Sequence, residues 1–574
     1  MVEPVETAFL QMVISTGSMT AYWSLWNMYG NYLDEAAKIV AEKRDENLKF
    51  EHARLTADEK DQLLKEYHPD RIASQFEELK IGPNKGQKAP HELADMLQAN
   101  PRIEPEHIDL NHVDYEADVL VIGGGGAGTS AAIMASEAGA KVLLVTKLRV
   151  GDANTMMAEG GIQAADKPND SPAQHYLDAF GGGHFDGKPE LVYTLVNKAP
   201  SVIKWLNDLG VEFDKEADGT MVTTHGGGTS RKRMHACKDY SGAEIMRTLR
   251  DETFNRADSI TVVDFTSAIE IIKNDKGEAA GAVLMNMETN ELRIAKAKVV
   301  IIATGGAGRM HYQGFPTSNH YGATADGLVL AYRAGAKLLY QDSLQYHPTG
   351  AAYPTQILGK LVTEKVRSLG AKLINKDGEV YIHPLETRDV NASGIIREVK
   401  NGRGVKNDVQ DAVWLDTPMI DMIHGEGTIL KRIPAMYNMF IKYGIDIRKE
   451  PILVYPTLHY QNGGVEINKT CHSSVANLLV AGEASGGVHG TNRLMGNSLL
   501  DVVVFGREAG IEAGKMFKNI SLTDTSKLSL QHVKDFEKEM AEAGIKTDKV
   551  SPKLLPTYTH GNPEFEKKIP GASR

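Results

Sequence analysis

Cysteine is scarce in this sequence: Cys237 and Cys471 are the only two thiols among 574 residues. An iron–sulfur cluster needs about four thiolates, so this chain cannot hold one alone. Two thiols also exclude a disulfide-rich scaffold and favour a reducing compartment. If the protein moves electrons, they must leave directly from a bound cofactor or pass to another chain.

The sequence also lacks an excess of basic charge and a recognisable targeting signal. Its formal net charge of −11 argues against nucleic acid and against a broadly basic membrane-binding face. The N-terminus has no basic n-region and no twin-arginine motif. We therefore expect a cytoplasmic location, with a peripheral position on the cytoplasmic face of the membrane as the alternative.

Charge is absent from residues 7–33, which include Trp23 and Trp26. Polar residues interrupt the segment, so it makes a poor membrane-spanning helix. Three interpretations stay open: a helix buried against the protein's own body, a docking surface for a partner protein, or a segment at a membrane interface. Any membrane contact is expected through partners or through this segment.

Residues 1–115 are predicted to form a mainly helical N-terminal extension. Thr56 and Glu59 have the spacing of a capping box at a helix start. The stretch 82–105 is richer in Gly and Pro, which suggests a linker or an irregular arm.

A strand–turn–helix–strand pattern begins at Asp118. The segment ADVLVIGGGGAG predicts a buried strand and a glycine turn, followed by a helix of small residues and a second strand, KVLLVTK. Gly123, Gly125 and Gly128 fit G-x-G-x-x-G, where the glycines allow the turn, the approach of a pyrophosphate and helix packing. The second strand ends in Thr146-Lys147 rather than an acid, which argues against a simple nicotinamide site.

Two later strands end in glycine turns of the same kind. AKVVIIATGGAG ends at residues 304–306, and NLLVAGEASG contains Glu483. Strands that end in glycine turns far along the chain from the first one are typical of flavoproteins with two dinucleotide-binding domains. We predict an α/β, Rossmann-like FAD-binding domain in two parts, 116–340 and 458–520, with an inserted α+β capping domain at 341–457. A short tail, 521–574, follows, with a helix at 529–543 that ends before Gly544.

Five short islands between residues 345 and 500 carry the polar residues expected in a pocket. They read QYHPTG, LVTEKVRS, ETRD, TLHYQNGG and TNRLMGNSLL, and they supply His347, Thr363, Glu364, Arg367, Arg388, His459 and Arg493. Taken singly, each island is better explained by a surface arginine or a core histidine, and only the whole set points to a pocket. Several arginines around one cleft suit a dicarboxylate. The histidines show no metal-ligand spacing, so no metal site is predicted.

These motifs, in this order, resemble the flavoprotein subunit of fumarate reductase and succinate dehydrogenase, with L-aspartate oxidase as a close relative. The resemblance runs from about residue 117 to about residue 518 and includes IGGGGAG, AEGG, ATGGAG, QYHPTG, TEKVR, TRD, HYQNGG and NRLMGNSLL. The first 115 residues lie outside it, and the tail is shorter than is usual in that family.

The resemblance implies FAD and assigns it a set of contacts. The pyrophosphate would lie on the glycine turn, with Thr146 and Lys147 near the adenosine ribose. The segment 153–161 would line the flavin, Glu483 would lie on the ribose or ribityl side, and Ser498 and Leu499 would face the pyrimidine edge. The full cofactor set is Gly123, Gly125, Gly126, Ala127, Gly128, Thr146, Lys147, Ala153, Asn154, Thr155, Glu159, Gly160, Gly161, Thr304, Gly305, Asp326, Glu483, Arg493, Ser498 and Leu499.

Asn154 stands where relatives with covalent FAD have the flavin-linking histidine. Asparagine cannot form that bond, so the resemblance implies noncovalent FAD. Without the link the flavin should be a better electron donor, which favours fumarate reduction over succinate oxidation.

The implied reaction is hydride transfer between flavin N5 and an alkene carbon of fumarate, coupled to protonation of the neighbouring carbon. The resemblance assigns the proton to Arg388, refilled through Glu364 and Arg367, with His347 also in the catalytic set. The substrate would be held by His347, Thr363, Glu364, His459, Arg493, Gly160 and Phe213.

Two alternatives remain open. L-aspartate oxidases usually carry a Glu before a basic HSHRR-like run, and residues 224–233 contain no acid. A protein of another class, a flavin electron-relay or assembly subunit without its own substrate, would also explain a partner-facing extension. Because this chain lacks cluster ligands, an iron–sulfur subunit of the same complex is the expected partner.

Overall fold

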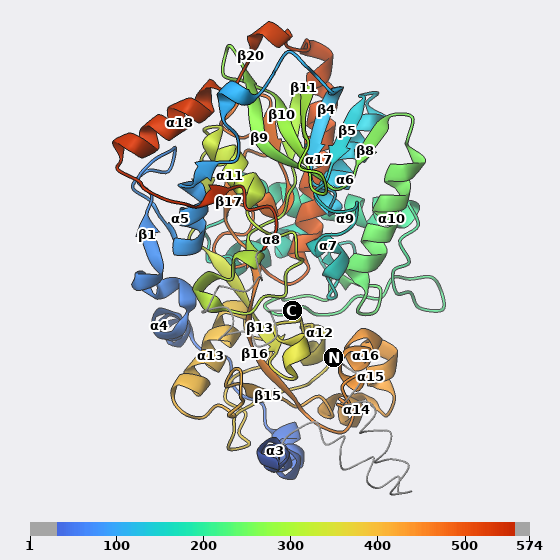
Figure 1. Cartoon of the computed structure of the whole chain (residues 1–574). Helices are drawn as coiled ribbons and strands as arrows, with labels where there is room; N and C mark the ends of the chain where they lie inside the picture. Colours follow the sequence, from blue (N-terminus) through green and yellow to red (C-terminus); the bar gives the residue numbers. More distant parts are fainter. Residues whose placement is uncertain (1–30, 557–574) are drawn as a thin grey trace, which may run out of the picture.

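The computed structural model describes residues 31–556, and two sheets dominate it, the larger one above the smaller in Figure 1. The larger sheet has the order β20-β9-β10-β11-β4-β5-β8, with β18 paired to β11. Strands β4, β5, β8, β11 and β18 run parallel, while β9 and β10 form an antiparallel meander. The bounds are β4 Tyr115–Ile122, β5 Val142–Val145, β8 Ile260–Val263, β9 Thr266–Asn274, β10 Ala279–Asn286, β11 Leu292–Ile302, β18 Leu478–Val480 and β20 Leu528–Ser529.

The predicted strand–turn–helix–strand unit is present, with helix α6 (Gly126–Glu137) between β4 and β5. Gly123 has φ +117°, and a Cβ there would lie 2.3 Å from the carbonyl oxygen of Ala303. A Cβ on Gly128 would lie 1.8 Å from the carbonyl oxygen of Gly123. Only glycine therefore fits these two positions, which confirms the Rossmann-like α/β class.

Helix α17 (Asn497–Met516) packs directly on α6 through glycines. A Cβ on Gly506 would lie 2.5 Å from the carbonyl oxygen of Ala127, and one on Gly510 would lie 2.3 Å from that of Ala131. These glycines, one helical turn apart, let the two backbones approach closely. The approach fixes the start of α17, residues 497–499, over the glycine turn.

The smaller sheet belongs to the capping region and is antiparallel, in the order β13-β16-β15-β14. Its core includes Trp414 and Phe440, both completely buried. The bounds of its strands and helices are β13 Leu344–Ala351, β14 Leu373–Ile374, β15 Val413–Leu415, β16 Ile452–Gln461, α12 Lys365–Ser368, α13 Arg388–Lys400, α14 Met419–His424, α15 Thr428–Arg432 and α16 Pro434–Ile441. The expected cap of helices and strands over the FAD-binding sheet is confirmed.

Shorter elements complete the part between the two sheets. A three-stranded sheet has the order β12-β17-β19, and β6 pairs with β7. The bounds are β6 Ile162–Gln163, β7 Met234–His235, β12 Leu338–Leu339, β17 Gly464–Glu466, β19 Ser485–Gly486, α7 Asn154–Met157, α8 Pro172–Gly182, α9 Pro189–Asp208, α10 Ser241–Asn255 and α11 Asp326–Arg333.

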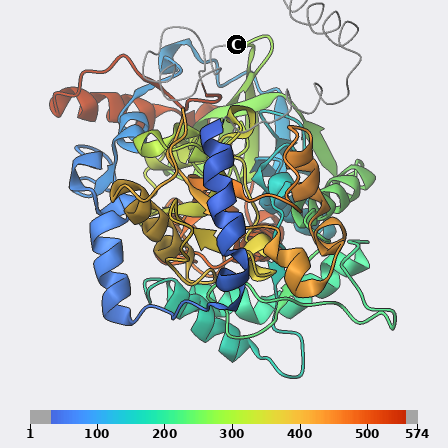
Figure 2. The ribbon, with the colours of Figure 1, turned by 90° about the horizontal axis from the view of Figure 1, so that it is seen from below.

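The first two described helices of the N-terminal extension cover the cap. Helix α3 (Asn31–Lys49) crosses the cap face in Figure 2, and its Arg44 makes an ion pair of 2.9 Å with Asp416. Helix α4 (Ala57–Tyr67) begins with the expected capping box of Thr56 and Glu59. Residues 7–30 of the uncharged segment, with both of its tryptophans, lie outside the described residues. Between residues 31 and 556, no helix has the length and apolar character needed to cross a membrane.

The stretch 82–105 is an ordered arm. It contains α5 (His91–Leu97), whose Leu93 and Leu97 are buried, so the interpretation as a linker is wrong. The apolar spacing within this short helix, rather than its flanking Gly and Pro, decides its packing. Short strands β1 (Phe76–Glu78) and β2 (Lys88–Pro90) precede α5, and β3 (Asn100–Pro101) follows it.

The tail crosses the FAD-binding domain. Helix α18 (Gln531–Glu542) matches the predicted tail helix, and Gly544 follows it with φ +68°. Strand β20 joins the main sheet beside β9, and β21 (Val550–Ser551) pairs with β3. The tail thus returns to the body of the protein and ends its described course near residue 556.

Candidate active site

A cavity lies at the carboxyl ends of β4, β5, β11 and β18, where ligands bind in open α/β sheets. It contains about 1290 Å³ of space free of protein atoms, part of it open to solvent. Its lining includes these residues from the predicted cofactor set: Gly123, Gly125, Gly126, Ala127, Thr146, Lys147, Ala153, Asn154, Thr155, Thr304, Gly305, Asp326, Glu483, Ser498 and Leu499.

The glycine turn of this cavity fits a pyrophosphate. Gly125 is the N-cap residue of α6, so the positive end of the helix dipole faces the cavity. The backbone N–H of Gly126 donates to Thr155 Oγ1 at 3.1 Å, which fixes α7 beside the turn. Gly128 is absent from the lining of the cavity, and its lack of a Cβ allows the close contact with the Gly123 carbonyl described above. The local geometry therefore suits the dinucleotide that the sequence predicts.

Lys147 and Asp326 form a buried ion pair at one end of the cavity. The Lys147 ammonium also donates to Thr324 Oγ1 at 2.7 Å and to the carbonyl oxygen of Leu554 at 2.5 Å. The backbone N–H of Leu554 donates to Asp326 Oδ1 at 3.1 Å. Burial lowers the pKa of Lys147, and Asp326 opposes that shift. The tail thus closes this end of the cavity by bonding to both partners of the ion pair.

Asn154, which lines the cavity, is fixed by three hydrogen bonds. Its Nδ2 donates to Glu483 Oε2 at 3.0 Å and to Asn319 Oδ1 at 2.6 Å, and its Oδ1 accepts from the backbone N–H of His320 at 2.6 Å. Burial raises the pKa of Glu483, while the hydrogen bonds from Gln461 and Asn154 oppose the rise. Asn154 is therefore a neutral side chain locked beside Glu483.

Four predicted residues near the flavin segment lie outside the lining of this cavity. Gly160 and Gly161 pack tightly, since a Cβ would lie 2.4 Å from Met495 Cε and 2.3 Å from the carbonyl oxygen of His235, respectively. Burial, with Asp239 nearby, raises the pKa of Glu159 well above its usual range. The Phe213 ring is buried edge-on to His235, 6.1 Å between centroids.

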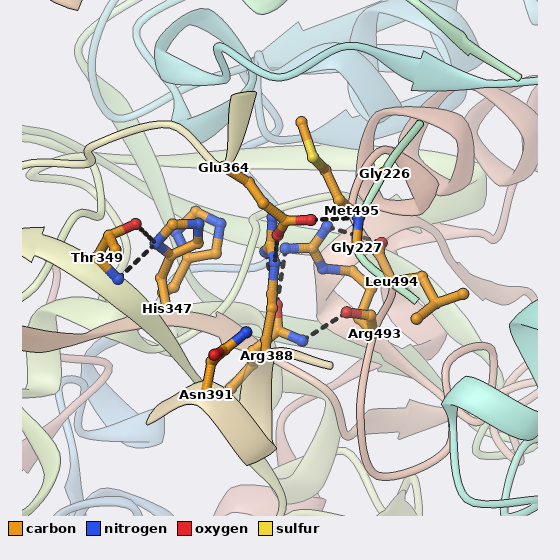
Figure 3. Close-up of polar contacts among 12 residues, drawn as sticks. Gly226, Gly227, His347, Thr349, Glu364, Arg388, Asn391, Arg493, Leu494 and Met495 are labelled. Atoms are coloured by element: carbon orange, nitrogen blue, oxygen red, sulfur yellow. Dashed lines mark hydrogen bonds and ion pairs between the residues drawn. The ribbon is translucent and has the colours of Figure 1, made fainter. Parts of the chain in front are cut away.

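Arg388, Glu364 and Arg493 converge, as Figure 3 shows. They adjoin the cavity described above, which we call the first cavity, because Arg493 Nη1 donates to the hydroxyl of Ser498 in its lining at 2.9 Å. Arg388 Nε donates to Glu364 Oε2 at 2.9 Å, and its Nη1 donates to Gln345 Oε1 at 2.9 Å. Arg493 Nη2 donates to the same Gln345 oxygen at 2.9 Å. Arg367 Nη2 lies 3.5 Å from Glu364 Oε2. We call Glu364, Arg367, Arg388 and Arg493 the arginine cluster.

The arginine cluster carries a surplus of buried positive charge. Three arginines against one carboxylate leave two positive charges, and all four side chains are at most 8% exposed. Burial lowers the pKa of Arg493 to about 9, and Arg388 adds to the shift. Burial favours a raised pKa for Glu364, but Arg388 and Arg367 outweigh it and lower the pKa. A dianion would compensate this surplus, which is costly when left unpaired.

His347 and His459 lie beside the cluster with ring centroids 5.1 Å apart. Burial lowers both pKa values well below the usual range, and Arg388 adds to each shift, so both rings are neutral. His347 Nδ1 accepts from the backbone N–H of Thr349 at 3.2 Å, which places the proton on Nε2. That Nε2 is buried and has no hydrogen-bond partner among residues 31–556. His347 thus offers a free donor.

Gln345 and Gly227 are site residues that the sequence reasoning missed. Gln345 is two residues before His347 on β13, so the two-residue period of a strand could have identified it. The backbone N–H of Gly227 donates to Glu364 Oε1 at 2.5 Å, a contact that no side-chain motif signals. Thr363 is buried, and its hydroxyl accepts from the backbone N–H of Lys365 at 3.5 Å, so it lies at the edge of the cluster.

Comparison with known proteins identifies the family. The FAD binding domain model matches residues 118–499. The chain is 39% identical over 411 residues to one of the subunits of the fumarate reductase (CoM/CoB) of Methanothermobacter marburgensis, covering 70% of this chain and 73% of that protein. It is 34% identical to the succinate dehydrogenase flavoprotein subunit of Coxiella burnetii, covering 70% and 71%. L-aspartate oxidase of Vibrio cholerae is 32% identical, covering 72% and 77%.

Solved structures give the same result. A mutant of FrdA from E. coli quinol fumarate reductase superposes with a TM-score of 0.67 at 30% identity, over 75% of this chain and 74% of that chain. Sdh1 of Mycobacterium smegmatis superposes with a TM-score of 0.62 at 37% identity, over 74% and 72%.

Proposed function

This chain belongs to the FAD-binding family of fumarate reductase and succinate dehydrogenase flavoproteins and is an FAD-dependent oxidoreductase of that type, and we propose that it interconverts fumarate and succinate, mainly by reducing fumarate. The observation that best supports a dicarboxylate substrate is the position of Gln345 Oε1. This one neutral oxygen accepts hydrogen bonds from the guanidinium groups of both Arg388 and Arg493. A carboxylate in its place would give each arginine a charged acceptor.

In this proposal the two carboxylates of the substrate are held by different side chains. Arg493 would bind one carboxylate, supported by its position over the Tyr460 ring, 4.4 Å from the centroid. The free Nε2–H of His347 and the neutral ring of His459 would donate to the other. Thr363, Gly160 and Phe213 stay predictions as substrate contacts.

FAD in the first cavity would supply the hydride chemistry, and the side chains of the cluster would supply the proton. Arg388 is the proposed acid, because its guanidinium is the member of the relay that also reaches Gln345. Glu364 Oε2 lies within 2.9 Å of Arg388 and 3.5 Å of Arg367, so a proton lost from Arg388 can be replaced along a short chain. The lowered pKa of Glu364 keeps it ionised and able to accept.

We also propose that FAD is bound without a covalent link. Asn154 occupies the place of a linking histidine, and its amide is committed to Glu483, Asn319 and His320. A noncovalent flavin favours the reductive direction. Comparing fumarate reduction by a reduced viologen dye with succinate oxidation by an oxidised dye tests the direction; faster succinate oxidation would overturn it.

The partner and the location are further parts of the proposal. Relatives carry the word subunit in their names, and two cysteines cannot hold a cluster, so an iron–sulfur subunit is the proposed neighbour. The cytoplasmic location stays a prediction from the sequence. Purifying the native complex and identifying its subunits by mass spectrometry tests the neighbour; a complex without an iron–sulfur protein contradicts it.

A substrate panel tests the function itself. FAD-loaded protein is assayed with fumarate, succinate and L-aspartate. Turnover of fumarate and succinate supports the proposal. Formation of iminoaspartate from aspartate, without fumarate–succinate interconversion, would show an L-aspartate oxidase, and no turnover of any of the three would favour an electron-relay subunit.

A further inference from the structure

A second cavity lies outside the arginine cluster, between the loop 222–232 and helices α12, α14 and α15 of the cap. It contains about 1140 Å³ of space free of protein atoms, part of it open to solvent. We call it the basic cleft. Its lining has six basic side chains and no acidic one: His225, Lys232, Lys365, His424, Lys431 and Arg432.

Most of this charge has no partner in the protein. Within residues 31–556, Lys232, Lys431 and Arg432 make no ion pair and no side-chain hydrogen bond. Ser368 also lines the cleft, although its Oγ is buried. A cleft lined by cations without a counter-charge suits an anion.

The acids and cations around the cleft support this interpretation. Asp421, on α14, is turned to the backbone N–H groups of Gly427 and Ile429, at 3.2 and 2.9 Å. Burial lowers the pKa of His225; Lys232, Arg233 and Arg231 add to that shift, and Asp178 opposes it.

Only a thin layer of protein separates the basic cleft from the arginine cluster. His225 and Lys365 line it, and they are the neighbours in sequence of Gly226 and Glu364. The Gly227 N–H bonds Glu364, and a Cβ on Gly227 would lie 2.4 Å from the Glu364 carboxylate. Glycine backbone therefore forms the wall at this point. The cleft is thus a second opening on the side of the cluster formed by residues 225–227 and 364–365.

We propose that the basic cleft is an outer binding site for the dicarboxylate dianion, from which the substrate passes to the arginine cluster. This inference rests on the proposed function. The protein as a whole carries a net charge of −11 and repels a dianion. A cleft of the opposite sign raises the local concentration of the substrate, an effect worth about 10- to 1000-fold in association rate at low salt.

The test uses charge reversal at two side chains that are outside the arginine cluster. The variant K431E/R432E is compared with K442E/K469E, which makes the same charge change at two exposed lysines outside the cleft. We expect kcat/KM for fumarate to fall about tenfold in K431E/R432E at about 20 mM ionic strength and to approach the control at about 300 mM, with kcat within about twofold. The neutral variant K431Q/R432Q should show a smaller loss.

Direct binding separates this inference from the proposed function. Titration of the FAD-loaded protein with malonate, an unreactive dicarboxylate, should show weaker binding by K431E/R432E than by the control. If the protein does not turn over fumarate but this difference in malonate binding is observed, the proposed function is wrong and the proposed binding site in the basic cleft is supported. Equal malonate binding, or equal kcat/KM at every ionic strength, overturns the cleft, as does binding of only an acidic partner protein there.

Discussion

Arg388 donates from Nε to Oε2 of Glu364 at 2.9 Å, and both side chains are buried at the start of α13 and α12. The same Glu364 is held by the backbone of Gly227 and lies 3.5 Å from Arg367. The carboxylate therefore links the two arginines, and the proposed proton relay depends on it.

Replacing Arg388 should abolish proton delivery without removing FAD. We expect Arg388→Gln to lower kcat for fumarate about 10³-fold, since general-acid catalysis commonly contributes about 10²- to 10⁴-fold. Arg388→Lys keeps the charge but not the two-pronged geometry, so it should recover only a small part of the rate. The absorption spectrum of bound flavin is the control, and near-normal turnover with an unchanged spectrum would contradict the role of Arg388.

Glu364→Gln should change how stability depends on pH. Because the folded-state pKa of Glu364 is lowered, its ionised form stabilises the fold above the unfolded value of about 4.3, and this contribution is lost as the pH falls through the folded value. The Tm of the variant should lie below that of the wild type at about pH 7, and the gap should narrow below about pH 4.3. A gap that is constant from about pH 7 to about pH 3 would refute the coupling; Glu426→Gln, at an exposed position, is the control.

Asn154 gives a chemical test of how the cofactor is attached. Acid-denatured protein should release all its FAD to the supernatant, because the asparagine amide cannot bond the flavin. The readout is flavin fluorescence of the precipitated chain on a denaturing gel. Fluorescence that stays with the chain would mean that another side chain forms the link.

Asp326→Asn should weaken FAD retention. The change leaves the buried Lys147 ammonium without its counter-charge, while the amide Oδ1 can still accept from the Leu554 N–H. We expect the Kd for FAD, measured by equilibrium dialysis, to rise roughly tenfold or more. Asp275→Asn, at a half-exposed carboxylate, is the matched control; equal Kd values for both variants would exclude a part for the Lys147–Asp326 ion pair in FAD retention.

The sequence predicted what depends on local pattern. The glycine turn, the strands around it and the capping box at Thr56 follow from neighbouring residues, and the structure confirms them. The six charged or aromatic residues that meet in the site, His347, Glu364, Arg367, Arg388, His459 and Arg493, each lie in a recognisable island.

What the sequence did not predict depends on contacts between distant segments. Gly510 on α17 meets Ala131 on α6, and the Leu554 backbone reaches Lys147 across 407 residues. The Gly227 N–H on Glu364 is a backbone contact across 137 residues. Periodicity and motif spacing contain no information on such pairs, so the basic cleft and the tail closure required the structure.

The central claim is that the arginine cluster binds a dianion with both carboxylates paired, and a flavin absorbance titration tests it most directly. FAD-loaded protein is titrated with succinate and with its monomethyl ester, which keeps the shape but loses one charge. Since a hydrogen bond to a charged group contributes about 1.5–3 kcal/mol, the ester should bind roughly 10- to 100-fold more weakly. Equal affinity for the two compounds would contradict the account.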